Sequence, residues 1–194
     1  MGKVTDTLFV RRRHVCPRWF CFTFDNVLRK LVHRPARLVL PYLQPGAMAL
    51  DVGAGIGYFT IPMARAVGPS GRVIAADVQP AMLSAIERRA RRAGLSERVR
   101  THLSEPAALG VKETVDFALA FWVIHEVPEP AKLLREIHAT IRPGGFFLLV
   151  EPRLHVSPKQ FEELISAACA AGFALRDRPK VALSRAALLA RTGA

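Results

Sequence analysis

Short apolar runs alternate with longer amphipathic stretches from about residue 48 to the end of the chain. The apolar runs predict strands at 48–52, 72–77, about 98–103, 115–121 and 146–150. Apolar positions at helical spacing predict helices at 57–67, 80–94, 129–141 and 158–171. The last two segments, 173–178 and 181–190, could pair as an antiparallel hairpin. This alternation is typical of an α/β domain with a mostly parallel sheet.

Residues 1–47 do not follow this alternation. They are basic and aromatic, and a helix is expected only between residues 25 and 43. A chain of 194 residues suits a single domain with a sizeable core. We therefore expect residues 48–194 to form the domain. Residues 1–47 are expected to fold over its ligand-binding edge as a lid.

The formal net charge of +12 is unevenly distributed. Residues 1–45 hold nine Lys or Arg against two Asp or Glu. A second cluster, Arg88, Arg89, Arg91 and Arg92, falls in one predicted helix. Such patches can bind nucleic acid, so RNA is kept as an alternative partner. For the helical cluster, a solvated helix face is the favoured interpretation.

Three cysteines, Cys16, Cys21 and Cys169, are too few for a disulfide scaffold, which favours a cytoplasmic location. No apolar run approaches the roughly 18–20 residues that span a bilayer, so we expect no membrane association. Cys16 and Cys21 with His14 fall short of the four ligands of a zinc site, so no metal site is predicted. A thiophilic acceptor held by the three thiols stays an alternative.

A glycine turn follows the first predicted strand. Asp51 is followed by Gly53, Gly55 and Gly57, in the spacing G-x-G-x-G. A strand that reverses into a helix through glycines presents backbone amides to a ligand. The dinucleotide-binding pattern is instead G-x-G-x-x-G, and the carboxylate of Asp51 suits an ammonium group better than a pyrophosphate. The spacing therefore disfavours a nicotinamide oxidoreductase.

Four ordered segments resemble the class I S-adenosylmethionine (SAM) dependent methyltransferases and their small type 11 group. They are residues 50–60, 73–82, 115–127 and 141–152. The resemblance spans about residues 36–190. It implies a Rossmann-like seven-stranded sheet in the order 3-2-1-4-5-7-6, with strand 7 antiparallel and helices on both faces. It also implies SAM as the cofactor.

The family pattern assigns the first part of the cofactor site to the glycine turn. Gly53, Ala54 and Gly55 would form the backbone cradle for the methionine part of SAM, in a turn that Gly57 completes. Asp51 would orient that turn and the amino group of the cofactor.

The adenosine part is assigned to the next two strand ends. Asp77 would hold the ribose hydroxyls, although a carboxylate there could also cap the following helix. Val78 and Met82 would lie against the adenine ring. Glu105, where the family usually has Asp, would approach the adenine amine.

The remaining candidate residues lie at the end of the fourth predicted strand and just beyond it. Ala120 and Phe121 would line the methionine side of the cofactor. Methyl transfer is an in-line displacement, in which a base helps if the acceptor must lose a proton. His125 is the candidate base, with Glu126 and Glu151 behind it, and a packing role is the alternative for the imidazole.

The sequence thus predicts a SAM-dependent methyltransferase that acts on a small or medium-sized acceptor. Three alternatives stay open at this stage. They are an RNA methyltransferase that uses the basic N-terminal segment, a non-catalytic SAM-binding module, and a thiol or metalloid methyltransferase that uses the cysteines. The sequence predicts neither the acceptor nor the oligomeric state.

Overall fold

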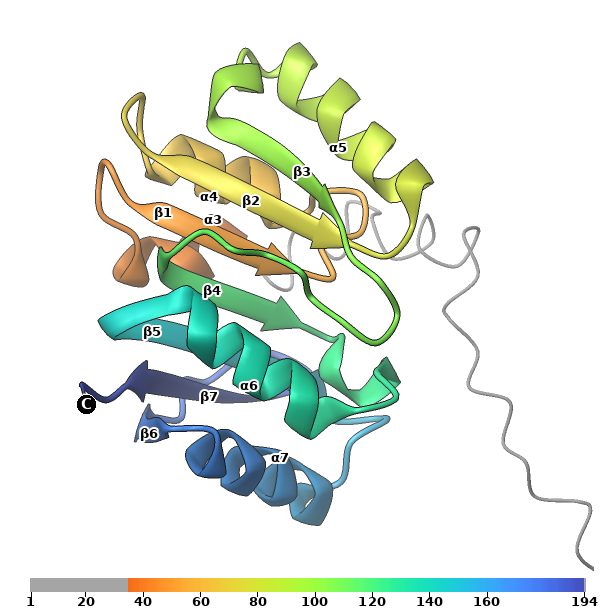
Figure 1. Ribbon diagram of the computed structural model, residues 1–194, viewed down its shortest axis with the longest axis vertical. Coiled ribbons are helices and arrows are strands. Elements are labelled where there is room, and N and C mark those ends of the chain that lie inside the picture. Colours follow the sequence, from red (N-terminus) through yellow and green to blue (C-terminus); the bar gives the residue numbers. More distant parts are fainter. Residues whose placement is uncertain (1–34, 194) are drawn as a thin grey trace, which may run out of the picture.

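The computed structural model describes residues 35–193, which form one sheet with helices on both faces (Figure 1). Its strand order, β3-β2-β1-β4-β5-β7-β6, confirms the predicted topology. β7 is antiparallel to β5 and to β6, and the other neighbours are parallel. The strands are β1 (Met48–Val52), β2 (Arg72–Asp77), β3 (Val99–Leu103), β4 (Val115–Phe121), β5 (Ile141–Pro152), β6 (Phe173–Asp177) and β7 (Ser184–Arg191).

Helices connect these strands across the two faces. The α-helices are α3 (Pro35–Val39), α4 (Thr60–Ala66), α5 (Pro80–Arg92), α6 (Pro130–Thr140) and α7 (Pro158–Ala170). Residues 35–193 also contain three 3-10 helices, η1 (Leu40–Tyr42), η2 (Ser96–Arg98) and η3 (Ile124–Glu126). Proline begins α5, α6 and α7, because its fixed φ suits the first turn and its missing N–H leaves no helical hydrogen bond unmade.

The core lies on both faces of β4, whose side chains alternate between the two layers. Phe117 and Leu119 pack with α3 and α4, whereas Ala118 and Ala120 pack with α6 and α7. Figure 1 shows α6 and α7 side by side on their face of the sheet. A strand covered on both faces needs apolar residues throughout, which is why the sequence predicted β4 without error.

Several element boundaries differ from the prediction: β7 begins at Ser184 instead of residue 181, and two further differences lie at glycine turns. The helix expected from residue 57 begins at Thr60, because Gly55 and Gly57 adopt positive φ and extend the turn. β5 begins at Ile141 instead of residue 146, where Ile141 pairs with Val115 across a register shift. Pro143-Gly144-Gly145 resembles a turn, but the chain passes through it within one long strand.

The described part of the expected lid, residues 35–47, packs into the domain core. Val39 and Leu43 are buried, and Tyr42 stacks on Phe117 with ring centroids 5.7 Å apart. The remainder of that segment, residues 1–34, lies outside the described residues and includes Cys16 and Cys21. Across residues 35–193, none of the helices has the length and apolar character that a bilayer crossing requires.

Candidate functional site

A cavity of about 920 Å³ opens at the carboxyl ends of β1, β2, β4 and β5. The arrowheads of β1, β2 and β4 point to this same edge of the sheet (Figure 1). Parallel strands bring their carboxyl ends together, and ligands of open α/β sheets bind at that edge. The predicted site residues on its lining are Asp51, Gly53, Ala54, Gly55, Asp77, Val78, Met82, Glu105, Phe121 and His125.

The glycine turn shapes the centre of this cavity. Gly53 has φ +65°, and a Cβ there would lie 2.4 Å from Cγ2 of Val123, so packing alone excludes a larger residue. Gly55 has φ +55°, and a Cβ there would meet nothing within 4 Å. Gly53 is therefore required by the protein itself, whereas Gly55 leaves bare backbone beside open space where a ligand can approach.

Asp77 ties the end of β2 to the glycine turn. Its Oδ2 accepts the Gly55 N–H at 2.8 Å, and its Oδ1 accepts the Gln79 N–H at 2.9 Å. Burial raises the pKa of this carboxyl, and the backbone hydrogen bonds partly offset that effect. A carboxylate oxygen has two lone pairs, so each oxygen can still accept one hydroxyl of a diol.

Asp51 lies on the same lining and is 2 % exposed. Its Oδ2 accepts the Thr60 hydroxyl at 2.6 Å. Burial raises the pKa of Asp51 to about 7, a shift that the Thr60 hydrogen bond opposes and the charge of Asp77 reinforces. Sequence reasoning missed Thr60, although a hydroxyl at the start of the helix after the glycine turn is the signal that could have found it.

The predicted adenine residues line one side of the cavity. Met82 is buried on α5, whereas Val78 is 39 % exposed at the end of β2. Glu105 is exposed in a tight turn, where its backbone N–H and C=O both pair with Ala108. The carboxylate of Glu105 is thus free to turn toward a ligand or toward water.

Two predicted cofactor residues do not line the cavity. Ala120 is fully buried in the core on β4. A Cβ at Gly57 would lie 3.1 Å from Cγ1 of Ile86, which shows that this glycine allows the turn to pack against α5. Phe121 does line the cavity and packs against Phe59, with ring centroids 4.4 Å apart.

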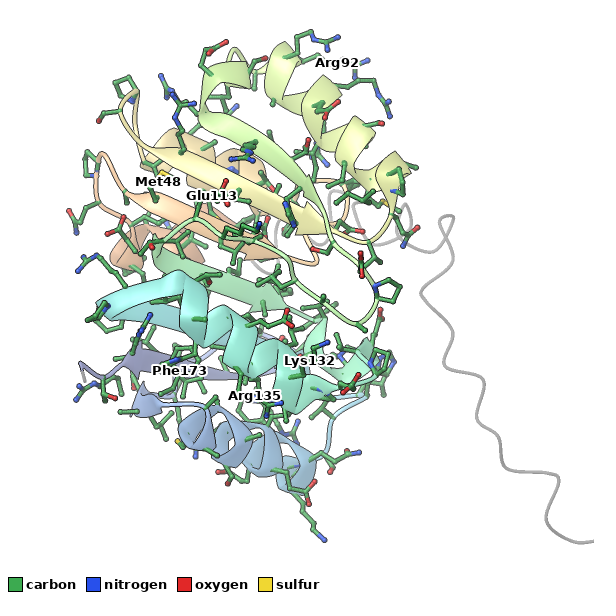
Figure 2. All side chains as sticks on the ribbon, in the orientation of Figure 1. Met48, Arg92, Glu113, Lys132, Arg135 and Phe173 are labelled. Atoms are coloured by element: carbon green, nitrogen blue, oxygen red, sulfur yellow. The ribbon has the colours of Figure 1, made fainter. Side chains whose placement is uncertain are left out.

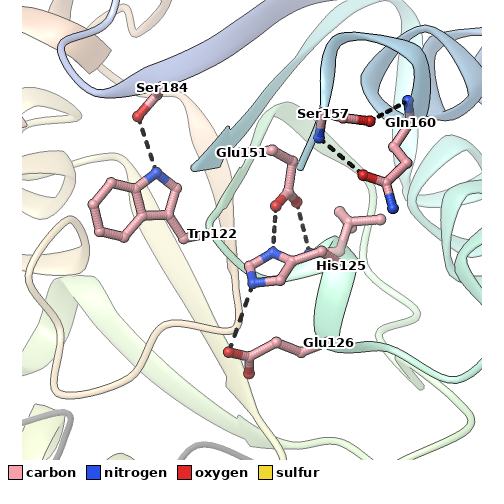
Figure 3. A network of polar contacts seen from close by, with 8 residues as sticks. Trp122, His125, Glu126, Glu151, Ser157, Gln160 and Ser184 are labelled. Atoms are coloured by element: carbon pink, nitrogen blue, oxygen red, sulfur yellow. Dashed lines mark hydrogen bonds and ion pairs between the residues drawn. The ribbon is translucent and has the colours of Figure 1, made fainter. Parts of the chain in front are cut away.

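His125 and Glu151 form a bonded pair beside the cavity (Figure 3). Glu151 is fully buried, its Oε1 accepts the Ile124 N–H at 2.9 Å, and its Oε2 bonds Nδ1 of His125. Burial disfavours the imidazolium, but the hydrogen bond and charge of Glu151, aided by Glu126, raise the pKa of His125. Glu151 is absent from the lining, so it holds the imidazole instead of serving as a second candidate base.

Glu126 lies on the cavity side of the same histidine. Its Oε1 is 3.9 Å from Nε2 of His125. Burial raises the pKa of Glu126, an effect that the positive charge of His125 opposes. His155 also lines the cavity, with its ring centroid 5.6 Å from that of His125, and no pattern in the sequence pointed to it.

The sequence model of a family described as a methyltransferase domain matches residues 49–145. This range runs from β1 through the glycine turn to the first residues of β5, and covers half of the chain. The protein belongs to the class I SAM-dependent methyltransferases.

Named relatives of this methyltransferase match a little over half of the chain. The chain is 32% identical over 110 residues to the ubiquinone/menaquinone biosynthesis C-methyltransferase of Pasteurella multocida, covering 56% of this chain and 41% of that protein. It is 32% identical over 104 residues to the arsenite methyltransferase of Halobacterium salinarum, covering 53% and 26%. The chain thus spans less than half the length of these curated relatives.

A solved structure shows the same fold over nearly the whole described domain. The SAM dependent methyltransferase of Aquifex aeolicus aligns with a TM-score of 0.79 at 23% identity, covering 90% of this chain and 97% of that one. This alignment covers much more of the chain than the family range of residues 49–145.

Trp122 is a further feature of the methyltransferase site that sequence reasoning missed. Its φ is +61°, which is rare for a residue with a side chain. Its Nε1 donates to Oγ of Ser184 at 2.9 Å, joining the loop after β4 to the start of β7 (Figure 3). Backbone strain of this kind persists where surrounding contacts hold it, and it often marks a functional loop.

Of the three cysteines, the described residues include Cys169 alone. Cys169 is exposed near the end of α7. Because α7 leads back to the start of β6, this thiol lies at the edge of the sheet opposite the cavity. Residues 35–193 contain no group of three or more His, Cys, Asp or Glu placed to hold a metal ion.

Proposed function

We propose that this protein transfers the methyl group of SAM to a small or medium-sized acceptor that binds in the 920 Å³ cavity. The observation that supports the proposal is that the predicted cofactor residues and the candidate base line one cavity. A backbone cradle at Gly55, the carboxylate of Asp77 and the imidazole of His125 all face it. When bound, the cofactor supplies a methyl group already activated by its sulfonium charge.

The residues present fit that cofactor. The open space at Gly55 can take the methionine part, and the carboxylate of Asp51, which ionises above its pKa of about 7, can hold its ammonium group. Asp77 can accept two hydroxyls of the ribose, since both of its oxygens keep a lone pair. Val78 and Met82 offer apolar contact for the adenine ring.

Glu105, in the tight turn beyond β3, completes the proposed cofactor site. Its exposed carboxylate can accept from the exocyclic amine of adenine. Phe121 closes the methionine side. Gly57 and Ala120 support the site through packing against α5 and within the core.

His125 is proposed to remove a proton from the acceptor through Nε2. Glu151 bonds Nδ1, which leaves Nε2 directed to the cavity side as the basic nitrogen of the neutral imidazole. Fixing the tautomer through the other ring nitrogen is a general means of orienting a histidine. The buried carboxylate also stabilises the imidazolium that forms once the proton has been taken.

The cavity favours a small acceptor over the alternatives. By their names, one of the related proteins is a C-methyltransferase of ubiquinone/menaquinone biosynthesis and the other is an arsenite methyltransferase, and both names refer to small molecules. Arg92 points outward from the last turn of α5 (Figure 2), and Arg88 and Arg91 are exposed. Arg89 instead donates to the backbone carbonyl of Ile56 in the glycine turn at 3.0 Å. The lining of the cavity includes none of these four arginines. Cys169 lies away from the cavity, which removes one of the three thiols from the metalloid alternative. We keep the cytoplasm as the proposed location, on the cysteine content.

Formation of S-adenosylhomocysteine tests this proposal. The protein is incubated with SAM and, in separate arms, pooled metabolites, arsenite with thiols, and RNA. We expect turnover with the metabolite pool, lost in Asp77→Ala and kept in Glu97→Gln, which alters an exposed carboxylate on η2. SAM binding without turnover in any arm would instead establish a non-catalytic module. Turnover confined to RNA would contradict the proposed acceptor class.

A further inference from the structure

A second, smaller cavity of about 240 Å³ lies between α7, the β6–β7 loop and the end of β5. Its lining contains four cations, Arg153, Arg178, Lys180 and Arg185, and a single acid, Glu162. We call this cavity the basic pocket. A hollow with such an excess of one charge attracts ligands of the opposite charge.

Arg185 lines this pocket and carries an unmet hydrogen-bond donor. Its Nη1 is buried and has no hydrogen-bond partner, and it is the single buried side-chain nitrogen or oxygen in that condition among residues 35–193. Buried guanidinium N–H groups are nearly always bonded, so an orphan of this kind calls for a partner. An anion in the pocket would supply it.

The remaining polar contacts leave most of the positive charge uncompensated. Glu162 is engaged by Arg178 alone, through two hydrogen bonds of 2.7 and 2.8 Å. Arg153 uses its Nε to donate to the backbone carbonyl of Ser184 at 2.9 Å. The nearby Asp177 accepts the backbone N–H of Arg178. Lys180 and Arg185 therefore face the pocket without a carboxylate bonded to either of them.

Pro158, the first residue of α7, also lines the basic pocket. The positive end of a helix dipole adds to the attraction for an anion placed there. The dipole of α7 therefore adds to the positive potential of the four basic side chains.

The basic pocket adjoins the larger cavity. Arg153 lines both cavities, and Leu183 lines the larger one while its neighbours Ser184 and Arg185 line the smaller one. The hydrogen bond from Trp122 to Ser184 forms part of the wall between the two. Both cavities open at the carboxyl edge because β7 is antiparallel, which places its first residues beside the last residues of β5.

We propose that the basic pocket binds a phosphate group carried by the methyl acceptor. This inference rests on the proposed function for the acceptor's reactive end, which would lie near His125 while its phosphate lies beside Arg185. A phosphate is favoured over a carboxylate because a doubly charged anion matches several cations, and guanidinium groups bind it in a forked geometry. The pocket thereby selects phosphorylated small molecules.

Titration with inorganic phosphate at constant ionic strength tests the pocket directly. We expect saturable binding to the wild-type chain, weakened at least tenfold in Arg185→Gln and also reduced in Lys180→Gln, which changes an exposed side chain and spares the fold. The matched control is Arg92→Gln, which removes the same charge from α5 and should bind phosphate as the wild type does. Equal affinity in wild type and both pocket variants, or no saturable binding to any of them, would overturn the proposal.

Further arms identify the source of the phosphate and separate this proposal from the proposed function. Phenyl phosphate should bind through Arg185, whereas benzoate at the same concentration should not. Tighter, Arg185-dependent binding of a short single-stranded oligonucleotide would overturn a small acceptor in favour of nucleic acid. SAM binding should be unchanged in Arg185→Gln. If phosphate binds but SAM does not, the proposed function fails and the pocket stands as an anion site.

Discussion

The backbone N–H of Gly55 donates to Oδ2 of Asp77 at 2.8 Å, across 22 residues of the chain. This bond joins the turn after β1 to the end of β2. The carboxylate proposed to hold the ribose therefore also holds the cradle proposed for the methionine part. Cofactor binding and the shape of the turn depend on the same side chain.

Two replacements of Asp77 test its proposed roles in cofactor binding and in shaping the turn. Asp77→Ala removes both, so we expect the SAM-induced rise in melting temperature to disappear. Asp77→Asn keeps one carbonyl oxygen as an acceptor and should retain part of that rise. Thermal unfolding with and without SAM measures both, with Glu97→Gln as the control. A full rise in Asp77→Ala would refute the ribose assignment.

Gly53→Ala should mainly lower stability, whereas Gly55→Ala should mainly lower SAM affinity. Both positions have positive φ, which costs an alanine about 1–2 kcal/mol. Gly53→Ala also meets Val123, and overpacking of this kind costs roughly 1–3 kcal/mol more. Gly55→Ala meets no protein atom but fills ligand space, so it should lose SAM affinity with a smaller loss of stability.

Gly94→Ala is the matched control for this pair, because Gly94 has φ +67° and open space around it, away from the cavity. Urea unfolding and SAM titration of the three variants give the comparison. Equal losses of stability in Gly53→Ala and Gly94→Ala would contradict the contact with Val123.

Asp51 should make the fold less stable as the pH rises. Its folded-state pKa is about 7, above the ordinary 3.8, so the folded chain holds this proton more tightly than the unfolded chain. The resulting stabilisation is complete below about pH 4 and is lost as the pH rises toward 7. Asp51→Asn should therefore lose less stability over that window. Melting temperatures from pH 4 to pH 8 test this, and parallel curves for both proteins would contradict it.

The pair of His125 and Glu151 predicts a shift in the pH profile of turnover. Glu151 raises the pKa of His125, so the neutral base forms at higher pH in the wild type. Glu151→Gln should move the acidic limb of kcat toward lower pH. His125→Gln should lower kcat by roughly 100-fold or more, the usual contribution of a general base, while SAM affinity changes little. If the acidic limb of the kcat profile does not move in Glu151→Gln, a group other than His125 titrates in that limb.

Much of the fold could be predicted because its decisive signals are local. β1, β2 and β4 are mostly apolar runs with polar residues near their ends, and the structure places them at the predicted residues. The cofactor candidates Asp51, Gly55 and Asp77 lie at strand ends, where topology alone brings them to one edge. The start of α4 was wrong because backbone conformation at glycine, and not apolar spacing, decides where that helix begins.

The parts that could not be predicted depend on contacts between distant segments. Trp122 and Ser184 are 62 residues apart and meet only because β7 returns beside β5. Glu151 lies near the end of a strand, where the sequence suggests an exposed residue that binds a ligand. In the structure it is fully buried and accepts the backbone N–H of Ile124. The basic pocket likewise draws its cations from three segments, and no local pattern brings these together.

Isothermal titration calorimetry with S-adenosylhomocysteine, the demethylated form of the cofactor, tests the central claim most directly. We predict saturable binding at one site per chain, abolished by Asp77→Ala and unaffected by Glu97→Gln. No binding of S-adenosylhomocysteine or SAM, together with saturation by a nicotinamide or flavin nucleotide, would contradict the account.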